Sequence, residues 1–227
     1  MTDEFGEIEK LTEIEKLADG SSQNIIRLLE LSHDSDEEVR HRSIEAFGSF
    51  EPTEAILSRV REGMNDEDEI VRTMSIELLG DWEDVDSIEK LYLALDDEIE
   101  IVRAAALTSL GQMGRKDIIG VVEEKYPDFD GIEKVSAAMA LYSLGKKQYL
   151  NDLFSLLDDD YYLIRCRTAN LLCDFVDEQD KAKVIEKMEF ALAIEKTVAA
   201  ASSLSNAIAE LEVDTEEDDD EEEDESP

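Results

Sequence analysis

Residues Asp96–Gly114 read DDEIEIVRAAALTSLGQMG, and altered copies of this stretch recur along most of the chain. It places apolar side chains at helical spacing behind a run of acids and closes on glycine. The related stretches are DEEVRHRSIEAFG at 36–48, DEIVRTMSIELLG at 68–80, VSAAMALYSLG at 135–145 and DYYLIRCRTANLLC at 160–173. Repetition about every 30 residues indicates stacked structural units, each too small to bury its apolar face alone.

Three positions recur with the repeat. A glycine closes four units and a cysteine the fifth, at Gly48, Gly80, Gly111, Gly145 and Cys173. Eight residues earlier, four of the units carry an arginine: Arg40, Arg72, Arg103 and Arg165. Five residues before the closing position every unit carries a small residue: Ser43, Ser75, Ala106, Ala140 and Thr168. This pattern resembles the short HEAT-like repeats of the phycobilin-lyase type over residues 20–212, a class that serves as adaptors, inhibitors, chromophore lyases and a few enzymes.

The resemblance implies an all-α fold, a right-handed α-solenoid superhelix of about six antiparallel helix pairs. We expect the first helices of the pairs at 22–32, 53–64, 85–95, 117–126, 148–157 and 179–191, and the second helices at 36–48, 67–80, 98–112, 131–145, 160–175 and 194–212. The domain organisation is then an N-terminal capping helix at 1–20, a repeat array at 21–213 and a tail at 214–227. The glycines that close the second helices suit a left-handed terminal residue.

The chain is strongly acidic, with 60 Asp and Glu against 22 Lys and Arg and a net charge of −38. The tail holds 11 of these acids and no base, so we expect it to be disordered. The acidity of the rest is uneven, because residues 51–100 carry a charge of −13 and residues 101–150 a charge of +1. Such a body repels phosphate backbones and anionic membranes, so we expect no nucleic-acid or membrane binding and a partner with a basic surface.

The same composition bears on the compartment. The opening residues, MTDEFGEIEK, lack a basic segment followed by an apolar one, and no apolar run is long enough to span a bilayer. Two cysteines do not make a disulfide framework. We therefore expect a cytoplasmic protein, and the acid content resembles that of proteins from salt-loving organisms.

The recurring arginines, which we call the arginine column, predict a structural ladder, that is, a series of ion pairs along the stack of repeats. In repeats of this class the arginine bonds acids of its own or the neighbouring unit. Asp36 and Asp68 stand four residues before Arg40 and Arg72, on the same face of a helix. A site for an anionic ligand is the alternative use of these arginines.

The weakly charged middle of the chain is a candidate docking surface. The second helices there carry six small or apolar residues outside the repeat columns: Ala104, Ala105, Thr108, Ala138, Met139 and Tyr142. An apolar trough rimmed by acids would accept a helix or an extended peptide. Tight packing between adjacent helices, with no partner, is the alternative. Trp82, Tyr161 and Tyr162 could anchor a partner or pack at the edges of units.

Signals for catalysis and cofactors are weak. His33 and His41, eight residues apart, match no metal-ligand spacing, and the His-Glu pairs of HEAT-repeat iron hydroxylases are absent. The pair Gly111 and Gly114 follows a helix, so it does not form a phosphate-binding loop. We therefore expect no catalytic residue, no cofactor and no metal.

Function follows from the architecture rather than from a motif. The interpretation favoured by the sequence is a monomeric, non-catalytic protein-binding adaptor or scaffold, and the resemblance implies a signalling or taxis complex as one setting for it. The first alternative is an acidic inhibitor or immunity-type protein that neutralises a basic, nucleic-acid-binding partner through residues 51–100. The second alternative, which the resemblance implies, is phycobilin lyase-like chromophore binding.

Overall fold

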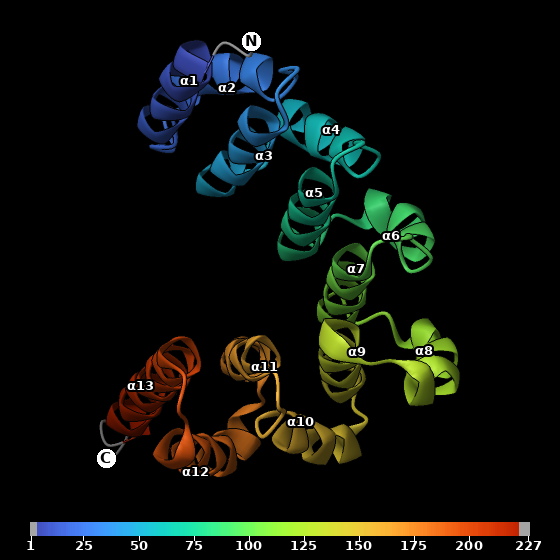
Figure 1. Ribbon diagram of the computed structural model, residues 1–227, viewed down its shortest axis with the longest axis vertical. Coiled ribbons are helices and arrows are strands. Elements are labelled where there is room, and N and C mark those ends of the chain that lie inside the picture. The colour runs from blue at the N-terminus through green and yellow to red at the C-terminus, as the bar shows by residue number, and fades with distance from the viewer. Residues whose placement is uncertain (1–3, 223–227) are drawn as a thin grey trace. The chain divides into compact units, whose positions relative to one another are not determined.

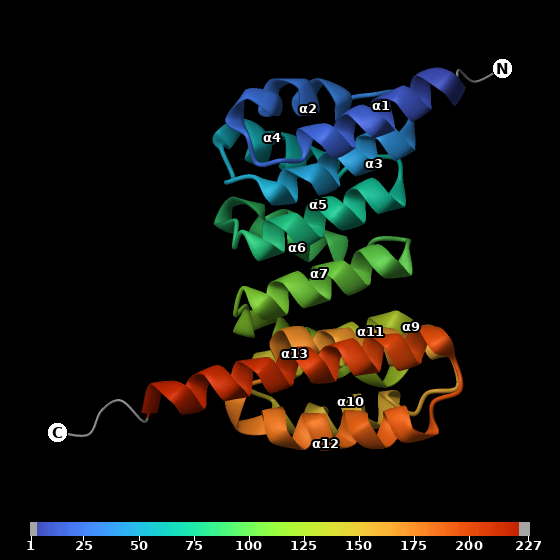
Figure 2. The same ribbon diagram turned by 90° about the vertical axis from the view of Figure 1, so that its left-hand side faces the viewer.

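The computed structural model describes residues 4–222, with side chains from 6 to 213, and every regular element in it is helical (Figures 1 and 2). The predicted all-α repeat architecture is confirmed. The chain divides at Met113–Gly114 into two compact units. The expected organisation into a capping helix at 1–20, a repeat array at 21–213 and a tail at 214–227 stays a prediction.

Unit 1 contains helices α1 to α7 in two layers (Figure 1). One layer holds α1 (Glu4–Leu17), α3 (Glu37–Ala46), α5 (Glu69–Asp81) and α7 (Glu100–Gln112), each packed on the next. The other layer holds α2 (Ile25–Leu31), α4 (Glu54–Gly63) and α6 (Ile88–Ala94). Short 3-10 turns, Ser22–Asn24, Phe47–Ser49 and Val85–Ser87, join the layers.

Unit 2 repeats this arrangement with helices α8 to α13. Helices α9 (Gly131–Ser143), α11 (Tyr162–Phe175) and α13 (Val198–Glu222) form one layer, and α8 (Ile119–Lys125), α10 (Leu150–Leu156) and α12 (Glu178–Ile194) form the other. Its 3-10 turns are Lys116–Ile118, Tyr126–Asp128 and Lys147–Tyr149. The α13 backbone reaches into the predicted tail, 214–227. The side chains of that tail and all of residues 223–227 lie outside the described residues, so its disorder stays a prediction.

The helix starts follow from local chemistry. Asp36 caps α3 by accepting from the backbone N–H groups of Glu38 and Val39, at 3.1 and 3.2 Å. Asp68 caps α5 in the same way, with both bonds at 3.0 Å. Such caps satisfy amide groups that have no partner within the helix.

The repeated apolar columns form the core. In unit 1 the fully buried side chains include Leu28, Val39, Ile44, Ile56, Val71, Ile76, Leu79 and Leu91. In unit 2 one cluster runs from Val135 through Leu153, Leu172 and Met188 to Leu211. Burial of this apolar surface is the main force that holds the layers together.

The four glycines that recur at the ends of the repeats were expected to end helices in a left-handed conformation, and most of them do not. Only Gly145 of the four has a positive φ, of 95°, and ends its helix as expected. Gly80 lies inside α5, where a Cβ would stand 2.6 Å from the Cβ of Ser109 on α7. Glycine is needed there because α5 and α7 approach closely, so its role is set by packing between helices.

Candidate partner-binding site

The six residues predicted to line a docking trough are mostly inside the fold. The residues Ala104, Ala105, Ala138, Met139 and Tyr142 are buried, and Thr108 alone is partly exposed. Their helices are covered on several sides, because α7 packs on α5 and α6, and α9 packs on α8, α10 and α11. The expectation of an exposed trough at these positions is therefore wrong for five of the six, and the small side chains serve close helix packing.

Tyr142 shows how a residue outside the repeat columns is used. Its hydroxyl donates to a carboxylate oxygen of Asp180 at 2.7 Å and accepts from the backbone N–H of Asp177 at 3.2 Å. Lys147 places its Nζ 3.7 Å from the centre of the ring. Burial, followed by the bond to Asp180, raises the pKa of the Tyr142 hydroxyl well above its ordinary value. The residue therefore links α9 to the start of α12.

Arg40 and Arg72 each join two successive repeats of unit 1. Arg40 donates from Nε and Nη2 to the carboxylate of Asp66, at 3.0 and 2.7 Å. Its Nη1 donates to the carbonyl oxygens of the turn before α3, in residues 34 and 35. Arg72 repeats the arrangement with Asp97, at 3.1 Å for both bonds, and with the carbonyls of residues 66 and 67. Each guanidinium thus bonds the backbone of the turn before its own helix and the carboxylate in the corresponding turn of the next repeat.

Arg165 makes the corresponding contacts in unit 2. It donates to Glu195 at 2.6 and 2.8 Å, to the Thr197 hydroxyl at 3.0 Å, and to the carbonyls of Asp159 and Asp160 at 2.6 and 3.1 Å. The bond from Arg165 holds the pKa of Glu195 far below its ordinary value. Arg103 holds its own turn through the carbonyls of residues 97 and 98.

The carboxylates that form ion pairs with the arginines are not those nearest to them in the sequence. Asp36 and Asp68, four residues before an arginine, are helix caps. The partner of Arg40 is Asp66, which lies two residues before Asp68, the cap of α5. Asp66 also accepts from the backbone N–H of Asp68 at 3.0 Å. Burial works to raise the pKa of Asp66, but the bonds from Arg40 and Asp68 outweigh it and leave that pKa lowered. Lys10 of α1 takes the place of the arginine for the first such acid, Asp34, at 2.6 Å.

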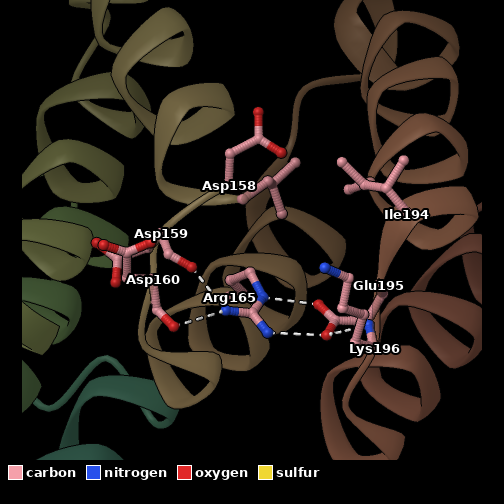
Figure 3. Close-up of a pocket in the computed structure, with 9 residues that line it drawn as sticks. Asp158, Asp159, Asp160, Arg165, Ile194, Glu195 and Lys196 are labelled. Carbon is pink, nitrogen blue, oxygen red and sulfur yellow. Dashed lines mark hydrogen bonds and ion pairs between the residues drawn. The ribbon is translucent and has the colours of Figure 1, made fainter.

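A hollow of about 280 Å³ opens in unit 2 between the turn before α11 and the end of α12 (Figure 3). It is lined by Leu157, Asp158, Asp159, Asp160, Arg165, Ala191, Ile194, Glu195 and Lys196. Arg165 is occupied by its bonds to the protein, so it is poorly placed to receive an anion. Among the described residues the carboxylates of Asp158 and Asp160 have no ion-pair partner, and Figure 3 shows that of Asp158 directed away from Arg165.

A second hollow, of about 230 Å³, adjoins the first. It is lined by Phe154, Ser155, Leu157, Asp158, Lys187, Phe190 and Ala191, so the two hollows share Leu157, Asp158 and Ala191. We call the two together the α10–α12 groove. Its floor, Leu157 and Ala191, is buried, whereas Phe190 and Ile194 on its wall are 63% and 56% exposed. The groove therefore offers apolar surface to solvent beside unpaired carboxylates.

The sequence carried one signal for this groove. Residues Phe190–Ile194 read FALAI, five apolar residues in succession near the end of a helix. A helix with one buried face cannot turn five successive side chains inward, so some of them must be exposed. The aromatic residues singled out from the sequence behave differently: Trp82 and Tyr162 are half-buried, and Tyr161 is exposed.

The described residues do not bring three His, Cys, Asp or Glu side chains close enough to hold a metal ion. His41 lies 3.5 Å from a carboxylate oxygen of Glu38 on its own helix, and His33 is exposed. Within residues 4–222, each helix is too short or too polar to cross a bilayer.

Comparisons with known proteins agree with this architecture. Residues 25–111 match the family model for HEAT repeats. The chain is similar to the solved complex of CpcE and CpcF of phycocyanin lyase from Nostoc sp. PCC7120, with 16% identity, a TM-score of 0.63, and coverage of 86% of this chain and 85% of that one. A designed armadillo repeat protein matches at 14% identity, a TM-score of 0.37, and coverage of 82% and 98%. No curated protein sequence matches the chain. The resemblance to HEAT-like repeats of the phycobilin-lyase type is thus confirmed at the level of the fold.

Proposed function

We propose that this chain of HEAT-like repeats is a non-catalytic protein-binding adaptor, and that a partner docks in the α10–α12 groove. The observation that carries the proposal is the exposure of Phe190 and Ile194 over a buried apolar floor. Large apolar side chains that line a concave surface are typical anchors of protein interfaces. The solved structure to which the chain is similar is itself a complex of two proteins.

Electrostatics favours a partner with a basic surface. The net charge of −38 attracts such a partner over long distances and repels acidic competitors. The same charge opposes binding to nucleic acids and to anionic membranes. We expect the chain to work in the cytoplasm as a monomer.

The test is retention of partners from an extract of the native host. The wild type is compared with the double variant Phe190→Ser, Ile194→Ser. The variant Val121→Ser is the matched control, because Val121 is another exposed apolar residue of unit 2, on α8. We expect the double variant to lose a protein that the wild type and the control retain. Equal retention by all three would remove the groove from the proposal.

An acidic inhibitor is the second candidate, and unit 1 offers an observation in its favour. The four bases of residues 51–100 all bond within the unit: Arg59 to Ser32, Arg61 to Asp84, Arg72 to Asp97 and Lys90 to the carbonyl of residue 61. Exposed acids such as Glu67 and Glu69 remain at the surface. An inhibitor of this type would lose its partner steeply with added salt, whereas apolar docking in the groove would not.

Chromophore binding is the remaining candidate, supported by the likeness of fold to a phycocyanin lyase. A change in the absorbance of a linear tetrapyrrole on mixing with the purified chain would favour it over the adaptor.

A further inference from the structure

We infer that the occupant of the α10–α12 groove is an amphipathic helix that seats apolar side chains against Phe190 and Ile194 and presents an arginine or lysine to Asp158. This inference rests on the proposed function and specifies the chemistry of the partner.

The shape of the groove selects a helix. Phe190 and Ile194 stand four residues apart on α12, so they form one ridge along that helix, with Ala191 and Leu157 beside it as a floor. The row of side chains at this spacing fits between the rows of a second helix, which have the same spacing. The two hollows share their floor, so one helix laid along the groove could place apolar side chains in both.

The charges of the groove select a cation. Asp158 lines both hollows and has no ion-pair partner among the described residues. The nearest guanidinium, that of Arg165, is held by Glu195 and by the turn before α11. At the other end, the Nζ atoms of Lys183 and Lys187 lie 5.1 and 5.9 Å from the centre of the Phe154 ring. A basic side chain beside the apolar anchors would therefore meet an unpaired carboxylate.

An acidic occupant would be disfavoured by the same residues. It would place its carboxylate near Asp158 and Asp160, which have no ion-pair partner among the described residues. Lys196 lines the same hollow, but the four acids there, Asp158, Asp159, Asp160 and Glu195, outnumber its two bases, Arg165 and Lys196. Opposed like charges lower affinity and exclude wrong partners. The groove is thus expected to discriminate between helices of equal hydrophobicity by the sign of their flanking charge.

The test uses two synthetic amphipathic helical peptides with identical leucine spacing, one flanked by arginines and the other by glutamates. Binding to the full chain is followed by fluorescence anisotropy, and the site is located by amide chemical shifts. We expect the arginine peptide to bind and to shift the amides of residues 158–160 and 187–194. We expect Asp158→Lys to weaken this binding about fivefold, because an exposed ion pair is lost and a like charge is added.

Two controls separate this inference from the proposed function. Glu124→Lys makes the same charge change on an exposed position of α8 and should alter binding less than about twofold. Equal effects of Asp158→Lys and Glu124→Lys, equal binding of both peptides, or failure of both to bind would overturn the inference of a basic helix. The proposed function would still stand if the double variant of Phe190 and Ile194 lost its host partner, and it would fall separately if that variant did not.

Discussion

Replacement of Arg165 by lysine tests whether the arginine column holds successive repeats together. The guanidinium makes two bonds to Glu195, one to Thr197 and two to carbonyl oxygens of the turn before α11. An ammonium group has three donors on one nitrogen, so it cannot face both carboxylate oxygens and reach both carbonyls. Lysine therefore keeps the positive charge but cannot make the same set of hydrogen bonds.

The expected loss of stability follows from the burial of the pair. The side chains of Arg165 and Glu195 are 14% and 4% exposed, so water screens their interaction little. A hydrogen bond to a charged group contributes about 1.5–3 kcal/mol. Lysine loses one bond to the Glu195 carboxylate and one bond to a backbone carbonyl. Water can replace the bond to the carbonyl of Asp160, an exposed residue, so the net loss is one hydrogen bond between charged groups. We expect Arg165→Lys to cost about 2 kcal/mol. Arg165→Ala should cost about 3–5 kcal/mol, since it leaves Glu195 without its cation.

The assay is denaturant unfolding followed by circular dichroism, with amide hydrogen exchange of α11 and α12 to locate the effect in unit 2. Arg42→Lys is the matched control, because Arg42 is half exposed and its partners among the described residues, Glu38 and Glu45, lie on its own helix. Its cost should stay below about 0.5 kcal/mol. Equal costs for Arg165→Lys and Arg42→Lys would refute the ladder as a source of stability.

Lowering the pH should reduce the difference in the free energy of unfolding between the wild type and Arg165→Ala. The bond from Arg165 lowers the pKa of Glu195 in the folded state below its ordinary value of 4.5. A lowered folded pKa means that the pair stabilises the fold above about pH 4.5 and loses this effect as the pH falls further. Arg165→Ala removes the largest cause of the shift. A difference between the two proteins that stayed constant below pH 4.5 would contradict this assignment.

Three further changes test the packing and capping of unit 1, each by denaturant unfolding. Leu110→Ala should cost about 2–5 kcal/mol because its side chain is fully buried, whereas Leu93→Ala, at a position 76% exposed, should cost less than about 0.5 kcal/mol. Gly80→Ala should cost about 1–3 kcal/mol through the clash with Ser109, and a double-mutant cycle with Ser109→Gly should show that part of this cost is relieved. Asp68→Ala should cost about 0.5–2 kcal/mol by uncapping α5, an effect that Glu67→Ala, on the exposed neighbour of the cap, should not reproduce.

The repeat architecture could be read from the sequence because its signals are local and recur. Apolar spacing, an acid at the start of each second helix and a small residue at a fixed place all reflect contacts within one helix or one pair. A single unit with these features would be ambiguous, whereas five aligned copies select one fold.

The partners of the arginines were decided by tertiary structure. Along the sequence, Asp36 and Asp68 were the nearest acids on the same helical face, and their use as caps removed them from the ladder. The partner of Arg40, Asp66, lies 26 residues away in the next turn, and the partners of Arg72 and Arg165 lie 25 and 30 residues away. That distance closes only when successive repeats stack.

Burial of the chain's middle and exposure of the α10–α12 groove were likewise decided by packing. Helical periodicity tells which side chains share a face, but not how many neighbours cover that helix. Helix α9 is covered by α8, α10 and α11, so Ala138 and Tyr142 are buried. Phe190 and Ile194 have the same apolar character and remain exposed, since the face of α12 that carries them forms the wall of the groove.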